Sequence, residues 1–178
     1  MEAATLLRPR AWLPLAAGVG VAVVLGVYGR LHDPIGASDV DFFLRVQLLK
    51  VWLATGVAVL LGVQLFTALA IYGVMPSASW IPALHRWSGR TALLLSVPVA
   101  VHCLYVFGLR GDTPRVLAHS LLGCLLYGVF VTKMLLLSRP GDGRGWGVPV
   151  AGGLLLTAAA GVWLTSALWF FTTIGTRW

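Results

Sequence analysis

The chain has 178 residues, of which 58% are hydrophobic and only 11% are charged. Soluble domains carry about 25% charged residues, so this composition excludes a soluble enzyme and a disordered chain, and it predicts an integral membrane protein. We assign the formal net charge of +7 to membrane topology and lipid headgroups, with no role for nucleic acid. Cys103 and Cys124 lie inside apolar runs and indicate no disulfide framework.

Five apolar runs follow one another along the chain, separated by segments rich in Pro and Gly. Each run is at least ~18 residues long, which fits a transmembrane helix and is too long for a barrel strand. We therefore predict an all-α fold, with residues 1–178 forming one transmembrane domain of five helices in contact with the lipid bilayer. The predicted spans cover about residues 11–28, 46–74, 87–109, 116–137 and 147–174. No small-residue cleavage site follows the first run, so we expect a retained signal anchor.

Side A denotes the membrane side that holds the N-terminus, and side B denotes the opposite side. Basic residues divide almost evenly, with seven on side A and six on side B, whereas Asp33, Asp39, Asp41 and Asp112 all fall on side B. This distribution favours a cytoplasmic N-terminus. Basic charge is mostly Arg, with Lys only at positions 50 and 133, which suggests a GC-rich bacterial genome. We expect a multi-pass protein of the bacterial inner (plasma) membrane.

Two histidines fall inside predicted spans at similar depth. At a rise of 1.5 Å per residue, His102 lies ~10 Å and His119 ~5 Å from side B. Ionisable side chains inside a membrane indicate functional sites because they are costly to bury there. Two imidazoles at matching depth are the ligands that a six-coordinate haem b requires. The alternative is that each histidine forms a hydrogen bond to a neighbouring helix.

Touching helices lie only 8–10 Å apart, which is too close for two histidines on one iron. The two helices would therefore have to splay or lie diagonally across the bundle. Pro98 can bend the third span near His102; the alternative is an ordinary membrane-helix proline. His32 follows the first span beside Asp33 and Pro34, so we expect it to be solvated in a loop.

Lys133 and His85 form a second pair of candidate cofactor-binding residues, on side A. Lys133 follows His119 by 14 residues, which returns it to within about 40° of the same helix face. We favour Lys133 as a propionate partner or a snorkelling lysine. The alternative is that it ligates a second haem. His85 opens the third predicted span, beside Arg86.

The segment His85-Arg-Trp-Ser-Gly resembles the His-Arg-x-x-Gly helix opening of cytochrome b561-like and ferric-reductase-like proteins. The whole chain also resembles a five-span family of actinobacterial membrane proteins that share this motif together with a His-Cys pair and His-Ser-x-x-Gly-Cys. The haem resemblance covers roughly residues 80–138. It implies haem b, quinone-linked electron transport and axial roles for His102 and His119, with His85 a third candidate. Two-haem relatives need four helix-borne histidines, whereas here only His102 and His119 lie well inside predicted helices.

The sequence contains no Cys-x-x-Cys-His, no Gly-x-Gly-x-x-Gly and no Walker loop, so covalent haem and a nucleotide-binding domain are excluded. Electrons would come from a quinol or from a partner protein. We expect exchange with quinol and with a redox partner protein on the outer face, which would make the chain a component of a quinol-linked oxidoreductase. One alternative is a cofactor-free membrane subunit or assembly factor. A weaker one is copper handling through His32, His102 and His119.

Overall fold

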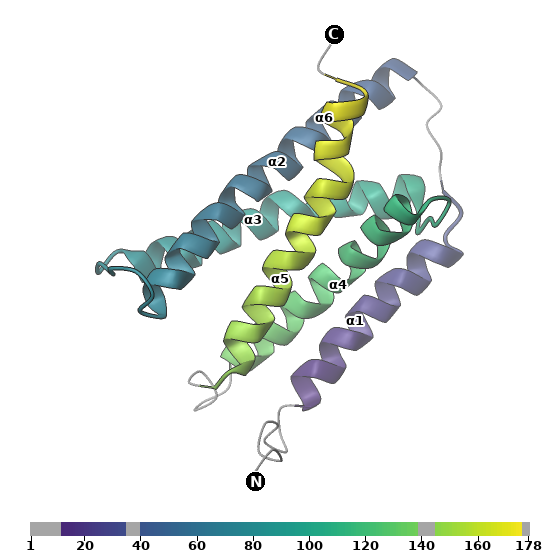
Figure 1. Cartoon of the computed structure of the whole chain (residues 1–178). Helices are drawn as coiled ribbons and strands as arrows, with labels where there is room; N and C mark the ends of the chain where they lie inside the picture. Colours follow the sequence, from purple (N-terminus) through teal and green to yellow (C-terminus); the bar gives the residue numbers. More distant parts are fainter. Residues whose placement is uncertain (1–11, 35–39, 139–144, 176–178) are drawn as a thin grey trace.

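The computed structural model describes residues 12–34, 40–138 and 145–175, and these form helices without a strand. The helices are α1 (Trp12–Leu31), α2 (Val40–Ile71), α3 (Ile81–His102), α4 (Pro114–Leu137) and α5 (Gly147–Trp163). Two π-helical turns extend the bundle: η1 (Cys103–Phe107) continues α3, and η3 (Leu164–Leu168) continues α5 into α6 (Trp169–Thr173). Five helical segments are long and apolar enough to cross a membrane, so the predicted all-α bundle of five spans is confirmed (Figure 1).

The start of α3 differs from the predicted boundary by six residues, since the helix begins at Ile81 and not at 87. Pro82 occupies the first turn, where its fixed φ suits a helix and its missing N–H costs no hydrogen bond. The expectation that only two histidines lie well inside helices is therefore wrong, because His85 lies in the second turn of α3. On side B, Thr113 caps the start of α4 by accepting a hydrogen bond from the Val116 amide at 3.3 Å.

The bundle has two halves: α2 pairs with α3 in a hairpin, while α4 packs against both α1 and α5 (Figure 1). The halves join toward side B, where Val51 of α2 packs against Ala167 and Phe170. Trp163 adds a hydrogen bond from its indole Nε1 to the Thr55 hydroxyl, at 3.2 Å. The side-B half of the molecule is therefore the part in which all of α2 to α5 converge.

Glycines set the contact between α1 and α4. A Cβ on Gly128 would lie 2.6 Å from the carbonyl oxygen of Gly18, and a Cβ on Gly18 would clash with Gly128 and with the Thr132 hydroxyl. Small residues let membrane helices approach closely enough for their backbones to touch. The Thr132 hydroxyl, which lies 3.2 Å from the Pro14 carbonyl, also joins the two helices.

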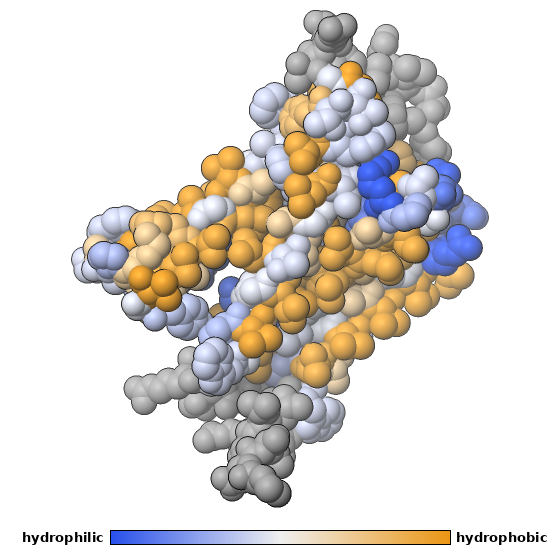
Figure 2. Space-filling view, viewed as in Figure 1, coloured by the Kyte–Doolittle hydropathy of each residue, from blue (hydrophilic) through white to orange (hydrophobic). Residues whose placement is uncertain are grey.

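The outer surface is apolar over most of its visible face, as expected for helices surrounded by lipid (Figure 2). Large exposed apolar side chains occur on every span, among them Val24, Val59, Leu94, Leu121 and Leu154. Toward side A the two halves diverge, and Figure 2 shows an open notch between the α2–α3 hairpin and α5. We call this opening the side-A notch.

Candidate functional site

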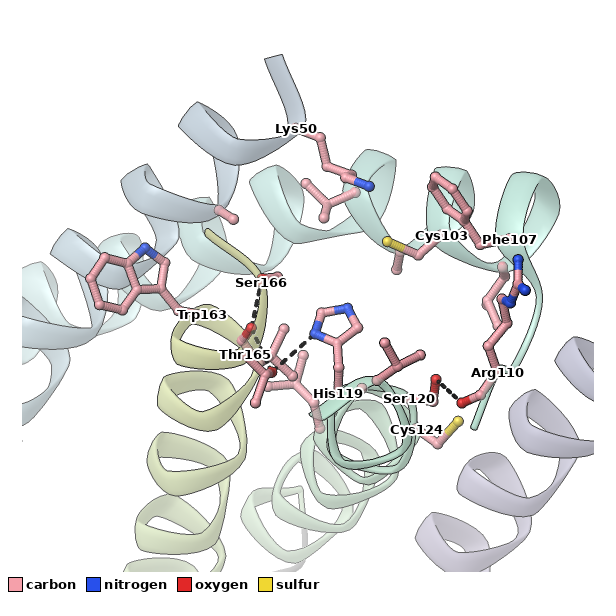
Figure 3. A pocket seen from close by; sticks show the side chains of 18 of the residues that line it. Lys50, Cys103, Phe107, Arg110, His119, Ser120, Cys124, Trp163, Thr165 and Ser166 are labelled. Atoms are coloured by element: carbon pink, nitrogen blue, oxygen red, sulfur yellow. Dashed lines mark hydrogen bonds between the residues drawn. The ribbon is translucent and has the colours of Figure 1, made fainter. Parts of the chain in front are cut away.

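A cavity of about 540 Å³ lies in the side-B half, between the α2–α3 hairpin and the α4–α5 pair (Figure 3). This volume falls within the range of ligand and cofactor pockets, which are mostly apolar with a few placed polar groups. Most of its walls are aliphatic and aromatic. The lining side chains that carry chemistry are Lys50, Cys103, Arg110, Arg115, His119 and Tyr127.

Two π-helical turns face the cavity, and each contributes residues to its lining. Cys103 and Phe107 come from η1, and Thr165 and Ser166 come from η3. A π turn shifts the backbone register, and in η3 two hydroxyls bond the carbonyls of the preceding turn: Thr165 to Gly161 at 2.7 Å and Ser166 to Val162 at 2.6 Å. Because π turns are rare and frequently occur at functional sites, a pair of them around one cavity makes it the candidate site.

His119 projects from α4 into this cavity, and its ring is held in one orientation. Its Nδ1 lies 3.2 Å from the Thr165 hydroxyl, which itself donates its proton to the Gly161 carbonyl. Thr165 therefore accepts a hydrogen bond from Nδ1–H, and the lone pair of His119 remains on Nε2. Figure 3 shows that second ring nitrogen directed into the cavity, away from Thr165. Metal-binding histidines are fixed by a hydrogen bond of this kind at the nitrogen opposite the metal.

Two cations from different helices reach the cavity wall near its side-B end. Lys50 of α2 holds its ammonium 4.6 Å from the centre of the Phe107 ring. Arg115 of α4 stacks its guanidinium at 3.8 Å over the Trp169 ring and donates a 2.6 Å hydrogen bond to the Thr165 carbonyl. Aromatic faces stabilise both charges in a region with little water, so neither cation needs a carboxylate to hold its position.

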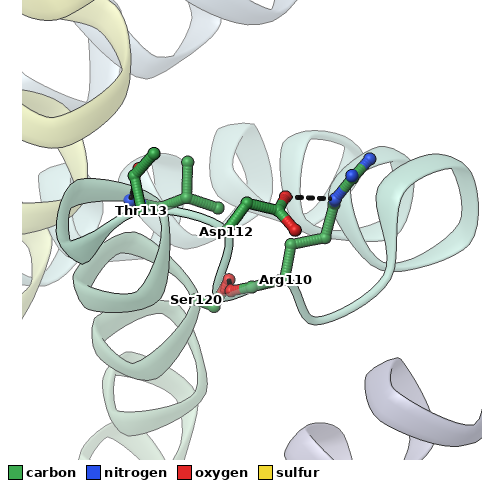
Figure 4. A network of polar contacts seen from close by, with 5 residues as sticks. Arg110, Asp112, Thr113 and Ser120 are labelled. Carbon is green, nitrogen blue, oxygen red and sulfur yellow. Dashed lines mark hydrogen bonds and ion pairs between the residues drawn. The ribbon is translucent and has the colours of Figure 1, made fainter.

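The segment between α3 and α4 contributes one ion pair to the side-B end of the cavity. Arg110 Nε lies 2.7 Å from the Asp112 carboxylate, and the Ser120 hydroxyl donates to the Arg110 carbonyl at 3.0 Å (Figure 4). Among the described lining residues, three cations therefore face a single carboxylate. The cavity wall carries two positive charges in excess, which suits an anionic ligand.

His102 lies as far from its helix end as His119 does, as the predicted similar depth requires, but it does not line the cavity. It lies five residues before the end of η1, and His119 lies five residues after the start of α4, so both are ~7.5 Å inside their helices. The His102 ring instead packs edge-to-face with Phe107, with 5.7 Å between the ring centroids. Its Nδ1 is buried with no hydrogen-bond partner in the described part of the chain. Its pairing with His119 on one iron stays a prediction.

The other predicted site residues also lie outside the cavity. His32, expected to be solvated, stacks on Tyr28 at 5.1 Å and lies 4.8 Å from the Tyr105 ring, with its Nε2 buried. His85 and Lys133 lie on side A. Across residues 12–34, 40–138 and 145–175, no group of three or more His, Cys, Asp or Glu side chains is placed to hold a metal ion.

Sequence reasoning missed the partners that orient His119 and charge the cavity wall. Lys50 and Arg115 entered only the count of basic residues on side B, although Lys50 lies inside an apolar run, where a charge is itself a signal, and Arg115 directly precedes one. Thr165 gave no signal, because Thr is common in membrane helices and its contact to His119 joins residues 46 positions apart.

Comparison with known proteins adds a family and no named activity. No curated protein and no solved structure matches the chain. Residues 11–178 match the family of unknown function DUF6529. The match covers nearly the whole sequence, including all five spans and every cavity residue, so the chain belongs to the DUF6529 family.

Proposed function

We propose that the protein is a membrane b-type cytochrome that binds haem b in the side-B cavity and exchanges electrons with quinol and with a partner protein on the outer face. The observation that carries this proposal is His119, whose Nε2 faces a cavity of about 540 Å³ while Thr165 holds Nδ1. Bound haem would supply a one-electron couple of the iron. A single fixed imidazole suffices for haem, whereas bare copper needs a larger set of ligands than the described residues offer.

Charge complementarity supports the same ligand. The two propionates of haem b match the excess of two positive charges among Lys50, Arg110, Arg115 and Asp112 on the cavity wall. The apolar walls suit the porphyrin ring, and they come from all five spans. In this arrangement Lys50 and Arg115, the two cations without a carboxylate partner among the described residues, would hold the propionates, and Thr165 would keep His119 in the tautomer that can bind iron.

His102 is the proposed second axial ligand, and this assignment requires a movement. Its ring would have to leave the edge of Phe107 and turn toward the cavity, and the unsatisfied Nδ1 gives it no hydrogen bond to lose. The membrane would be a bacterial inner membrane with the N-terminus in the cytoplasm, as the distribution of acidic residues favours. Side B would then be the outer face, on which the redox partner docks.

Absorption spectroscopy of the protein purified from haem-supplemented cells tests the proposal. We expect a reduced-minus-oxidised spectrum of low-spin haem b at one equivalent per chain. A folded, colourless preparation would contradict it and favour a cofactor-free membrane subunit.

Single substitutions test the ligands. His119→Ala should lose the haem, His102→Ala should convert it to high spin, and His32→Ala should leave it low spin, as the control. An unchanged spectrum in His102→Ala would remove that residue from the iron and leave His119 as its protein ligand.

A further inference from the structure

The side-A notch contains a histidine and a lysine that the side-B cavity does not use. His85 lies four residues after the start of α3, and Lys133 lies four residues before the end of α4. Both therefore sit ~6 Å inside the side-A ends of their helices, on different halves of the bundle. Both side chains are half-buried, and they interact electrostatically with each other.

A buried hydroxyl fixes the ring of His85. Its Nδ1 lies 2.7 Å from the hydroxyl of Thr67, which is fully buried and donates its own proton to the Val63 carbonyl at 2.7 Å. Thr67 therefore accepts from Nδ1–H, and the lone pair of His85 stays on Nε2. Gln64 anchors the same turn of α3 by donating to the His85 carbonyl at 2.6 Å. His85 is thus held in place as a hydrogen-bond acceptor and cannot snorkel to the headgroups.

Lys133 supplies the complementary donor. Its Nζ would lie 3.8 Å from a Cβ added at Gly152 of α5, so the missing side chain leaves room beside the ammonium. In the described residues the only ion pair joins Arg110 to Asp112 at the opposite end of the molecule. Lys133 therefore has an ammonium available for a ligand.

An acceptor and a donor at this depth, in a notch open to lipid, match a lipid-soluble ring that bears oxygen groups at both ends. A phosphate headgroup fits less well, because its oxygens are acceptors and would face the lone pair of His85 Nε2. We propose that the side-A notch binds the head ring of a hydroquinone, with one ring hydroxyl donating to His85 Nε2 and Lys133 donating to a ring oxygen. This inference deepens the proposed function, on which it rests for the role of the ring as an electron donor.

The position of the notch along α4 supports that role. Tyr127, which lines the side-B cavity, precedes Lys133 by six residues on the same helix, a rise of ~9 Å. Its hydroxyl lies 3.0 Å from Ser96 Oγ, so this pair closes the space between the two halves at the cavity floor. One short stretch of α4 therefore separates the notch from the cavity.

Photolabelling of the full chain in detergent with an azidoquinone, mapped by mass spectrometry, tests the site without requiring haem. We expect label on residues beside the notch, and excess decylubiquinol should block it. His85→Phe and Lys133→Met should each weaken this protection about tenfold, the loss expected for one buried hydrogen bond, and Lys133→Arg should restore most of it. Arg90→Gln on the same side and His32→Phe on the opposite side are matched controls that should change nothing.

Three results would overturn the inference. Label that maps to the side-B cavity and disappears in His119→Ala would place the ring there instead. Protection by phosphatidylglycerol but not by decylubiquinol would assign the notch to an anionic lipid. Unchanged protection in folded His85→Phe and Lys133→Met, with folding checked by thermal unfolding, would remove both residues from the site. A colourless protein that still shows notch labelling would refute the cytochrome proposal and leave the quinol site standing.

Discussion

His119 on α4 and Thr165 on η3 share a hydrogen bond of 3.2 Å whose direction is set from the threonine side. The single hydroxyl proton of Thr165 is committed to the Gly161 carbonyl at 2.7 Å, which leaves only its lone pairs for the imidazole. A π turn in the fifth span thereby determines which nitrogen of a histidine in the fourth span is available to a ligand.

Thr165→Val tests this relationship with little change in side-chain volume. Loss of the acceptor frees the His119 ring to rotate and to change tautomer, so we expect haem affinity to fall by about 10- to 100-fold. Haem titration of the apoprotein, followed by absorbance, measures the effect. Thr157→Val is the matched control, because Thr157 also bonds the carbonyl four residues earlier on the same helix, at 3.0 Å, but lies exposed. Equal affinities in the two variants would contradict the positioning role.

Arg115→Lys should not behave as a conservative change. The guanidinium stacks on Trp169 and donates to the Thr165 carbonyl, and an ammonium cannot do both in the same geometry. We expect a loss of about 1 kcal/mol of stability and weaker haem binding, measured by thermal unfolding and by titration. Arg90→Lys is the control, since Arg90 stacks over the exposed Trp87 ring at 5.1 Å; a larger effect there would disprove the prediction.

The hydroxyl pair Ser96–Tyr127 should stabilise the junction between the two halves. Ser96 donates to the Leu93 carbonyl at 2.8 Å, so Tyr127 donates to Ser96. Tyr127→Phe should lower the free energy of unfolding by about 1 kcal/mol, in the upper part of the range for hydrogen bonds between membrane helices. A double-mutant cycle with Ser96→Ala isolates the pair, and additive effects of the two substitutions would show that no coupling exists. Tyr72→Phe, at an exposed position, serves as the control.

Gly128→Ala should destabilise the contact between α1 and α4. The added Cβ would meet the Gly18 carbonyl oxygen at 2.6 Å, and because that atom belongs to the backbone, the two helices must move apart. Overpacking of this kind costs about 1–3 kcal/mol. Thermal unfolding in detergent measures it against Gly20→Ala, where the added Cβ meets nothing within 4 Å. Equal melting temperatures would show that α1 adapts without strain.

The sequence predicted the five spans and the depth of the histidines because both depend on chain length and on a fixed rise per residue. His102 and His119 do lie equally far, five residues, from the side-B ends of their helices. Rotation about the helix axis could not be predicted in the same way. The π turns and the splay of the two halves set that angle, and both arise from contacts between distant segments. As a result, His119 faces the cavity while His102 meets Phe107.

The partners of the histidines were hidden for a related reason. His119 and His85 are both fixed by threonines, Thr165 and Thr67, whose hydroxyls bond a carbonyl of their own helix. A threonine in an apolar run is unremarkable in sequence, and only the packing of two helices reveals which of them meets an imidazole. Charged residues were the better signal, since Lys50 stands out in a span by its cost alone.

The packing of α1 against α4 has a consequence for biogenesis. Among the five spans the ribosome delivers α1 to the membrane first, yet Gly18 has no partner until α4 has been made, more than 80 residues later. The cavity walls are likewise incomplete until η3 and α6 emerge near the C-terminus. The full set of cavity walls therefore exists only once α6 has been made, so a ligand that needs all of them enters after these helices, either through the bilayer or from the side-B face.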